Sequence, residues 1–254
     1  MKNLNRVQSI DRAVAIIECF SVNKRELKLS EIANMLDLNK STVHGIINTL
    51  KYHGFVDQDE LTLRYRLGVR FIEFGDTVIN SMSIRNVAFP IIDDICGKIE
   101  ETVHIAMLDG SDVIYIEKKE CTQSIKTSTK IGVRIPAHVT ADGRIILCHM
   151  EKNKLMDVFP RCIKKLTANT VTDKHKLIQM LEEMKEAGYA LDNQETVKGL
   201  ICVAAPIFNH EGNVKFSLSV TGPAMRLNED KIKELIIIIK KAAYEISCRI
   251  GYRG

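Results

Sequence analysis

The sequence predicts an α+β protein with two domains, and three observations support this fold class. Two short amphipathic helices joined by a tight turn are predicted within residues 30–50. Two pairs of strand-like segments follow after residue 100, each pair joined by a turn that contains glycine. A long amphipathic helix is predicted over residues 228–250, and such helices cover the sheet in α+β domains. The 254 residues, 45% of them hydrophobic, suffice for a core in each of two domains.

The first short helix is predicted to begin at Ser30, because serine is a good N-cap residue. Leu38 closes the turn behind Asp37. The apolar residues of this helix recur on one face at helical spacing: Ile32, Ala33, Met35 and Leu36. We therefore expect a supporting helix that packs against its successor.

A second helix is predicted after Asn39 or Ser41, either of which can cap it. Its buried stripe is Val43, Ile46, Ile47 and Leu50, and its outward residues are Lys40, Ser41, Thr42, His44 and Asn48. The N-terminal end of such a helix reaches base edges and phosphates when it lies in the major groove of DNA. No acidic residue occurs between residues 38 and 56. The pattern predicts a DNA-binding helix-turn-helix, although two such helices also occur as plain packing units.

A β-hairpin is predicted after the second helix. Residues 63–67 alternate apolar with basic or polar side chains, and the charged pair Asp59 and Glu60 marks the tip. A hairpin in this place is a wing that passes over the adjacent DNA backbone. Arg64 or Arg66 can reach a phosphate or the minor groove, and Arg64 is the predicted DNA contact of the wing.

The connection between the halves is predicted to be helical and not a flexible linker. Its apolar residues Leu67, Phe71, Phe74 and Val78 recur at helical spacing. Ser83 is the predicted cap of a further helix that extends to about residue 100, with its apolar stripe at Val87, Ile91, Ile95 and Ile99. We expect a winged helix-turn-helix domain over residues 1–68, a helical linker over 69–82 and a second domain over 83–254.

The second domain is predicted to be an antiparallel sheet flanked by helices. Asp109-Gly110 is a strong hairpin signal between the first two strands. The predicted strands are 102–108, 112–117, 200–208 and 214–221, and the predicted helices are 140–150, 173–187 and 228–250. In the last helix the inward residues are Ile232, Leu235, Ile236, Ile239, Ala243 and Ile246.

Composition excludes several classes of protein. A net charge of +4 argues against wrapping of nucleic acid by charge alone. Seven widely spaced cysteines without a C-x-x-C pair predict neither a disulfide framework nor a zinc site, as expected in a reducing cytoplasm. The longest isoleucine-rich run, residues 235–239, is too short to cross a bilayer, so we expect a soluble cytoplasmic protein without a membrane partner. No phosphate-cradling glycine loop is present, and we predict no cofactor and no metal.

The chain resembles the IclR family of bacterial transcription regulators over nearly its whole length. The similar blocks occur in the family's order: residues 7–13, 29–33, 40–44, 65–68, 101–104, 200–206 and 219–223. Two departures fall in the helix-turn-helix. Gly45 stands where the family usually has arginine, and Asp37 stands where the turn usually has glycine. Asp tolerates the left-handed conformation, so Asp37 is compatible with the turn.

The resemblance implies a winged helix-turn-helix and a ligand-sensing domain of the GAF or profilin-like kind. It further implies a repressor of a catabolic operon that binds a double-stranded DNA operator as a homodimer or homotetramer. Effectors of the family are mostly small organic, sugar or aromatic acids. Effector binding is then expected to change the angle between the sensing domain and the connector helix, and with it the spacing of the two recognition helices.

The family's effector pocket corresponds here to Ala141, Asp142, Asp192, Cys202, Ser219 and Thr221. Ser219 and Thr221 are two residues apart and so face the same side of their strand. Backbone amides at Ala141 and Asp142 would suit a carboxylate of the ligand. Asp142 itself would repel an acid unless it points away or accepts hydroxyl groups. A solvent-facing Asp142 at the helix start is an equal alternative.

Two other functions compete with ligand sensing. Cys202 with His138 or His104 as base could make a thiol hydrolase that carries a nucleic-acid-binding module. A buried cysteine on an apolar strand is more often inert. The third hypothesis is a regulator that has lost its response to ligand.

Cys148 and His149 are adjacent on a helix and point about 100° apart, so they are poor joint metal ligands.

Overall fold

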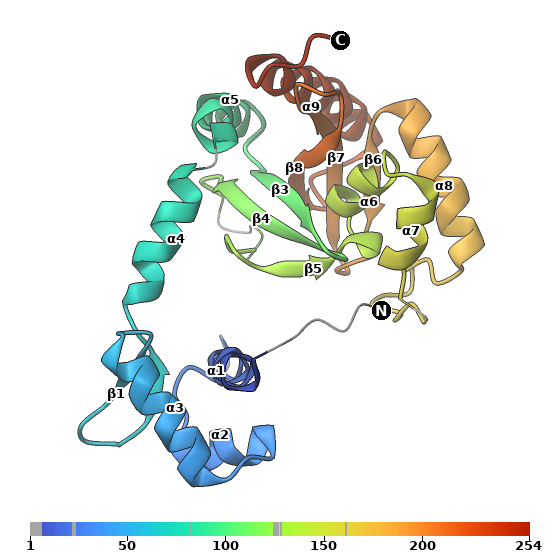
Figure 1. Ribbon diagram of the computed structural model, residues 1–254. Helices are drawn as coiled ribbons and strands as arrows, with labels where there is room; N and C mark the ends of the chain where they lie inside the picture. The colour runs from blue at the N-terminus through green and yellow to red at the C-terminus, as the bar shows by residue number, and fades with distance from the viewer. Residues whose placement is uncertain (1–6, 22–23, 82, 124–126, 128, 161) are drawn as a thin grey trace. The chain divides into compact units, whose positions relative to one another are not determined.

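The computed structural model describes residues 7–254 except 22–23, 82, 124–126, 128 and 161, and it divides into two units, Met1–Ser81 and Met82–Gly254 (Figure 1). The three-part division predicted from the sequence concerns which segment acts as a linker, and it stays a prediction. The first unit contains α1 (Gln8–Glu18), α2 (Leu29–Leu36), α3 (Lys40–Tyr52), β1 (Val56–Gln58), β2 (Tyr65–Leu67) and α4 (Arg70–Ser81).

The helix-turn-helix is confirmed, with corrections in its first helix. Helix α2 begins at Leu29, and the residue before it is Lys28, so Ser30 is not the N-cap. The Glu31 carboxylate accepts the Lys28 backbone N–H at 2.6 Å, which replaces a serine cap. Met35 is 44% exposed and not buried. It lies at the edge of the apolar face of α2, and Ile32 and Ala33 are at the centre of that face. Helix α3 follows Asn39 and buries Val43 and Ile47 completely.

Asp37 ends α2 in the left-handed conformation, with φ 51°. The Leu38 N–H then donates to the Ala33 carbonyl at 3.0 Å and closes the turn. Aspartate is one of the few residues other than glycine that adopts this conformation readily. The predicted compatibility of Asp37 with the turn is therefore confirmed.

Replacing Asp37 with alanine is expected to lower the free energy of unfolding by about 1 kcal/mol, because an alanine Cβ is strained at positive φ. Asp37→Gly is expected to be at least as stable as the unchanged protein. Urea unfolding measures both variants, and Glu60→Ala, at another exposed acidic residue, controls for the lost charge. A glycine variant less stable than the alanine variant would contradict this reading of the turn.

The wing is confirmed, although its second strand is shorter than predicted. Strand β1 pairs antiparallel with β2 only over 56–58 and 65–67. Leu63 lies outside the strand at φ 56°, in a tip where the Asp59 carboxylate accepts the backbone N–H of Thr62 at 2.7 Å. Leu67 belongs to β2 and not to the connector helix, which begins at Arg70. A Cβ at position 68 would meet the Gly54 carbonyl oxygen at 2.1 Å, so this crossing requires Gly68.

Helix α4 begins against Phe55 in the first unit. Phe71 packs edge-on against Phe55, and Phe74 stacks on the same ring. Phe74 remains 48% exposed although it stacks on Phe55. The side chain of Val78 lies outside the described residues.

The second unit is an antiparallel sheet between two layers of helices, as predicted (Figure 1). Its strands are β3 (Thr102–Asp109), β4 (Asp112–Lys119), β5 (Arg134–Pro136), β6 (Ala190–Asn193), β7 (Leu200–Phe208) and β8 (Val214–Pro223). The strand order is β5-β4-β3-β8-β7-β6. Its helices are α5 (Ser83–Ile99), the 3-10 turn η1 (Ala137–Val139), α6 (Ala141–Leu147), α7 (Lys152–Val158), α8 (Lys174–Ala187) and α9 (Glu229–Arg249).

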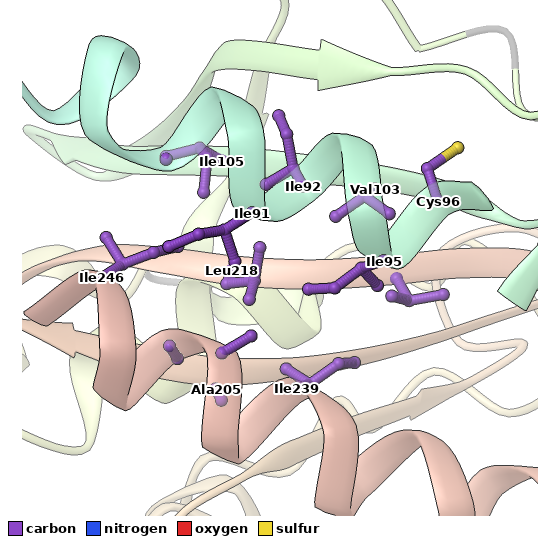
Figure 2. Close-up of a cluster of buried hydrophobic side chains, with 14 of the residues drawn as sticks. Ile91, Ile92, Ile95, Cys96, Val103, Ile105, Ala205, Leu218, Ile239 and Ile246 are labelled. Atoms are coloured by element: carbon purple, nitrogen blue, oxygen red, sulfur yellow. The ribbon is translucent and has the colours of Figure 1, made fainter. Parts of the chain in front are cut away.

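Two hydrophobic cores lie on opposite faces of this sheet. Figure 2 shows the first, where Ile91 and Ile95 of α5 meet Leu218 of β8 and Ile239 of α9. The second core packs α6, α7 and α8 against the other face. Ser83 is the first residue of α5 and not its cap, and α6 ends at Leu147, three residues earlier than predicted. Strands β5 and β6 and helix α7 were not predicted, because these short segments show no clear periodicity.

Candidate functional site

Helix α3 exposes a polar face on the first unit. Lys40, Ser41, His44 and Asn48 are exposed, and Thr42 is half-buried. The Asn48 amide lies 3.4 Å from Nδ1 of His44, so these two side chains form a pair on the exposed face. The structure thus brings the predicted residues of α3 onto one surface, and their contact with DNA stays a prediction.

Both arginines of the wing have partners within the first unit. Arg64 donates to the Glu31 carboxylate at 3.3 Å and to the Glu26 carbonyl at 3.2 Å. Arg66 donates to Asp57 across the hairpin at 2.8 Å and 3.1 Å, and this hydrogen bonding lowers the pKa of Asp57. A phosphate contact by Arg64 would therefore exchange Glu31 for phosphate.

Gly45→Arg is expected to strengthen DNA binding. Gly45 is exposed, and a Cβ there would meet no atom within 4 Å. An added arginine contributes one further cation, and each phosphate contact steepens the salt dependence of log K by about 0.9. Helix α3 would also gain about 1 kcal/mol from the loss of glycine. Fluorescence anisotropy with a labelled duplex at several salt concentrations measures both the affinity and the slope.

Gly75→Arg is the matched control, because Gly75 lies in α4 and a Cβ there also has open space. It adds the same charge and removes the same helix-weakening residue. Equal gains in DNA affinity from both variants would contradict the assignment of α3 as the DNA-reading helix.

The second unit contains a cavity of about 70 Å³ on the α6 face of its sheet. Residues from several elements surround it: Tyr115, Thr129, Ile135, Thr140, Ala141, Asp192, Thr196, Val197, Leu200, Cys202 and Thr221. Four of the six predicted effector residues therefore line one cavity. The other two, Asp142 and Ser219, are buried and are not among the lining residues, and Asp142 is bonded to two residues that are, Tyr115 and Cys202.

Strand register explains why distant residues meet at the cavity. Cys202 of β7 is opposite Asp192 of β6 and also opposite Thr221 of β8. Thr140 caps α6 by accepting the Gly143 N–H at 2.9 Å. A Cβ at position 143 would meet the Ala137 carbonyl oxygen at 2.0 Å, so Gly143 is required for the close approach of α6 to η1.

Asp142 is fully buried, with 0% of its surface exposed. The alternative of a solvent-facing helix-start carboxylate is therefore wrong: α6 packs with this end against the sheet. Its Oδ1 accepts the Ser217 hydroxyl at 2.7 Å, and its Oδ2 accepts Tyr115 Oη at 3.4 Å and Cys202 Sγ at 3.9 Å. Burial raises the pKa of Asp142 to about 6, and these donors oppose the rise.

A second carboxylate, Asp192, lines the cavity from β6. It accepts the Glu195 N–H at 2.7 Å and the Thr196 hydroxyl at 2.6 Å. Burial raises the pKa of Asp192, and these two donors oppose that rise. Asp192 thereby holds the start of the loop that carries Thr196 and Val197 along the cavity.

The same loop is tied to α6 by a buried ion pair. Arg144 donates through both terminal nitrogens to Glu195, each at 2.7 Å, and through Nε to the His138 carbonyl at 2.8 Å. The side chains are 1% and 9% exposed. A bidentate pair of this kind fixes geometry as well as charge. It joins two walls of the cavity.

The Cys202 thiol is poorly suited to be a nucleophile. Burial, then the Asp142 charge, raises its pKa well above the ordinary value, so the reactive thiolate is disfavoured. Its partner is Asp142, and no histidine is hydrogen-bonded to it within the described part of the chain. Burial lowers the pKa of His104 to about 3, so this imidazole is neutral and a weak base.

Several residues that line the cavity were not predicted from the sequence as site residues. Tyr115 lies in a strand that was predicted, but nothing in the sequence shows that its hydroxyl reaches Asp142 of α6 on the same face of the sheet. Thr196 and Val197 belong to a loop that begins with a local turn, in which Asp192 accepts the backbone N–H of Glu195 three residues later. An aspartate in this position is a turn signal that is visible in the sequence. Thr129 carries no such signal.

Two family models match this chain. The IclR helix-turn-helix model matches residues 9–60, and the model of the IclR C-terminal domain of bacterial transcriptional regulators matches residues 76–248. The chain belongs to the IclR family. It is thus a DNA-binding transcription regulator with an effector-binding domain, and the hydrolase hypothesis for Cys202 is wrong.

Relatives named as transcriptional regulators align over almost the whole chain. The transcriptional regulator XynR of Escherichia coli K12 is 32% identical over 97% of this chain and 98% of its own. The transcriptional repressor AllR of Salmonella typhimurium is 28% identical over 97% of this chain and 91% of its own.

Solved structures of the IclR family share the fold. IclR of Thermotoga maritima is 32% identical, with a TM-score of 0.77 over 97% of this chain and 100% of that one. An IclR homologue of Microbacterium hydrocarbonoxydans, solved with 4-hydroxybenzoate, is 23% identical, with a TM-score of 0.84 over 96% and 99% of the two chains. Within the described residues of this IclR protein, no helix is long and apolar enough to span a membrane.

Proposed function

We propose that this chain is a repressor of a catabolic operon. A small organic or sugar acid releases the protein from its operator or modulates its affinity for the operator. The observation that carries the sensing role is the cavity between α6 and the sheet, with Ala141, Asp192, Cys202 and Thr221 in its wall. Asp142 and Ser219 complete the proposed effector site as buried residues, Asp142 next to Tyr115 and Cys202 and Ser219 two residues before Thr221 on the same strand. The name of AllR supports repression, and the 4-hydroxybenzoate complex of a relative supports an acid effector.

On the DNA side we propose that α3 lies in the major groove. Lys40, Ser41 and Thr42 reach bases and phosphates from its N-terminal end, His44 and Asn48 follow along the groove, and Arg64 contacts the backbone from the wing. The protein binds as a homodimer or homotetramer, because a two-fold pair of recognition helices matches a palindromic operator. Half-sites would then lie about 34 Å apart or a multiple of this distance.

Operator binding tests this function. DNA upstream of the gene for this protein and of its neighbours is footprinted with the purified full-length protein, with and without a panel of organic and sugar acids. We expect a protected palindrome for which one acid lowers the affinity of the protein five- to 150-fold. This change corresponds to a coupling free energy of about 1–3 kcal/mol. Protection that no acid changes would leave a DNA-binding protein without the proposed response, and absence of any protected site would refute the repressor.

A further inference from the structure

The position of Asp142 bears on the class of effector that the cavity accepts. Tyr115 and Cys202 both line the cavity and both donate to Oδ2 of Asp142. These two side chains therefore separate the buried carboxylate from the cavity. Ser217 holds the other oxygen, Oδ1, at 2.7 Å.

The two donors present acceptor atoms to the cavity. An ionised carboxylate only accepts hydrogen bonds, so the hydrogens of Tyr115 Oη and Cys202 Sγ are directed at Asp142. Burial, then the Asp142 charge, raises the pKa of both groups well above the ordinary value, so each keeps its hydrogen. The lone pairs of the Tyr115 oxygen remain for a ligand, and a hydroxyl group is the ligand donor that matches them.

Among the described residues that line the cavity, the charged side chain is Asp192, and none is lysine, arginine or histidine. Asp142 adds a second carboxylate, bonded to the lining residues Tyr115 and Cys202. The Arg144 cation in the adjoining walls is already neutralised by Glu195. A ligand carboxylate near Tyr115 and Cys202 would face the fully buried Asp142 carboxylate, and like charges repel more strongly where burial lowers the dielectric constant. A hydroxyl group in the same place meets no such repulsion.

We propose, given the function proposed above, that Asp142 determines effector specificity: it excludes a carboxylate from the Tyr115–Cys202 end of the cavity and selects a hydroxyl group there. The effector is then a hydroxy acid that points its hydroxyl group at this wall and its carboxylate away from it.

Two matched series of compounds test the proposal. The first is benzoate, 4-hydroxybenzoate and terephthalate, and the second is pentanoate, 5-hydroxypentanoate and glutarate. Within each series the end opposite the shared carboxylate carries hydrogen, hydroxyl or a second carboxylate. Isothermal titration calorimetry with the full-length protein gives the affinities at about pH 7.5, where a carboxyl group with a pKa near 6 is ionised.

In at least one series, the unchanged protein is expected to bind the hydroxyl compound about ten-fold or more tightly than either other member. Asp142→Asn is expected to bind the dicarboxylate about ten-fold or more tightly than the unchanged protein does. Asp94→Asn removes the same charge from an exposed position on α5, on the other face of the sheet, and is expected to leave the order unchanged. Tyr115→Phe removes the acceptor without changing charge, and should lose the hydroxyl preference but gain no dicarboxylate binding.

Tyr115→Phe also keeps the test decisive if Asp142→Asn does not fold. The proposal is overturned if terephthalate and glutarate bind the unchanged protein as tightly as the hydroxy acids. It is also overturned if both series behave identically in the unchanged protein and in the Asp142 or Tyr115 variant. The footprinting test is independent of this result, since an operator that responds to a hydroxyl-free acid would uphold the sensor and refute the role of Asp142.

Discussion

Arg144→Met is expected to lower the free energy of unfolding of the second unit by about 3–5 kcal/mol. The substitution leaves the Glu195 carboxylate buried without its bidentate partner. An uncompensated buried charge strongly destabilises the folded state. It also frees the His138 carbonyl from its bond to Arg144 Nε. Urea unfolding measures the loss, and hydrogen exchange of β6 and β7 assigns it to this unit.

Two further variants separate burial from charge. The double variant Arg144→Met, Glu195→Met is expected to recover much of the lost stability, because two apolar side chains need no partner. Arg249→Met breaks an exposed pair with Glu245 on α9 and is expected to cost no more than about 0.5 kcal/mol. Similar losses from the buried and the exposed pair would show that the Arg144–Glu195 pair has no special role.

The stability of the protein is expected to fall as pH rises from about 4 to about 7 through the ionisation of Asp142. Its pKa is raised from 3.8 to about 6 in the folded protein. A raised carboxyl pKa favours the folded state where the group is protonated, and this advantage is lost as pH rises through the folded value. At 1.36 kcal/mol for each pKa unit, the difference amounts to about 3 kcal/mol.

Asp142→Asn isolates this contribution. Other groups also titrate in the same range, including Asp192, whose pKa is raised too. The quantity to measure is therefore the difference in unfolding free energy between the variant and the unchanged protein at each pH. That difference is expected to move by about 3 kcal/mol in favour of the variant between about pH 4 and pH 7. A difference that stays constant with pH would mean that the folded pKa of Asp142 is close to 3.8.

Segments with a clear periodicity or turn signal could be predicted from the sequence, and short segments without either signal could not. Helix α9 and the β3–β4 hairpin carry long hydrophobic stripes or a strong turn signal, and both are confirmed. Strand β6 has four residues and begins beside a glycine turn, so no alternation develops in it. Its register with β7 nevertheless brings Asp192 to the cavity.

Side-chain environment was harder to predict than position. Asp142 was expected near the effector, but its burial depends on contacts with Ser217 and Cys202, which are 75 and 60 residues away in the chain. Arginine is seldom fully buried, so Arg144 gave no signal. Its partner lies 51 residues away and is visible only in three dimensions.

Strand β7 separates the two cores, and its side chains alternate between them. Cys202 borders the cavity, whereas its neighbours Ile201 and Val203 pack among the residues of α5 and α9 on the opposite face. A shift of the Cys202 backbone would therefore displace Ile201 and Val203 in the isoleucine-rich core, and close-packed interiors have little free space to absorb such a movement. The sheet thus couples its two faces mechanically. A displacement of β7 at the cavity is expected to require repacking of α9 on the opposite face.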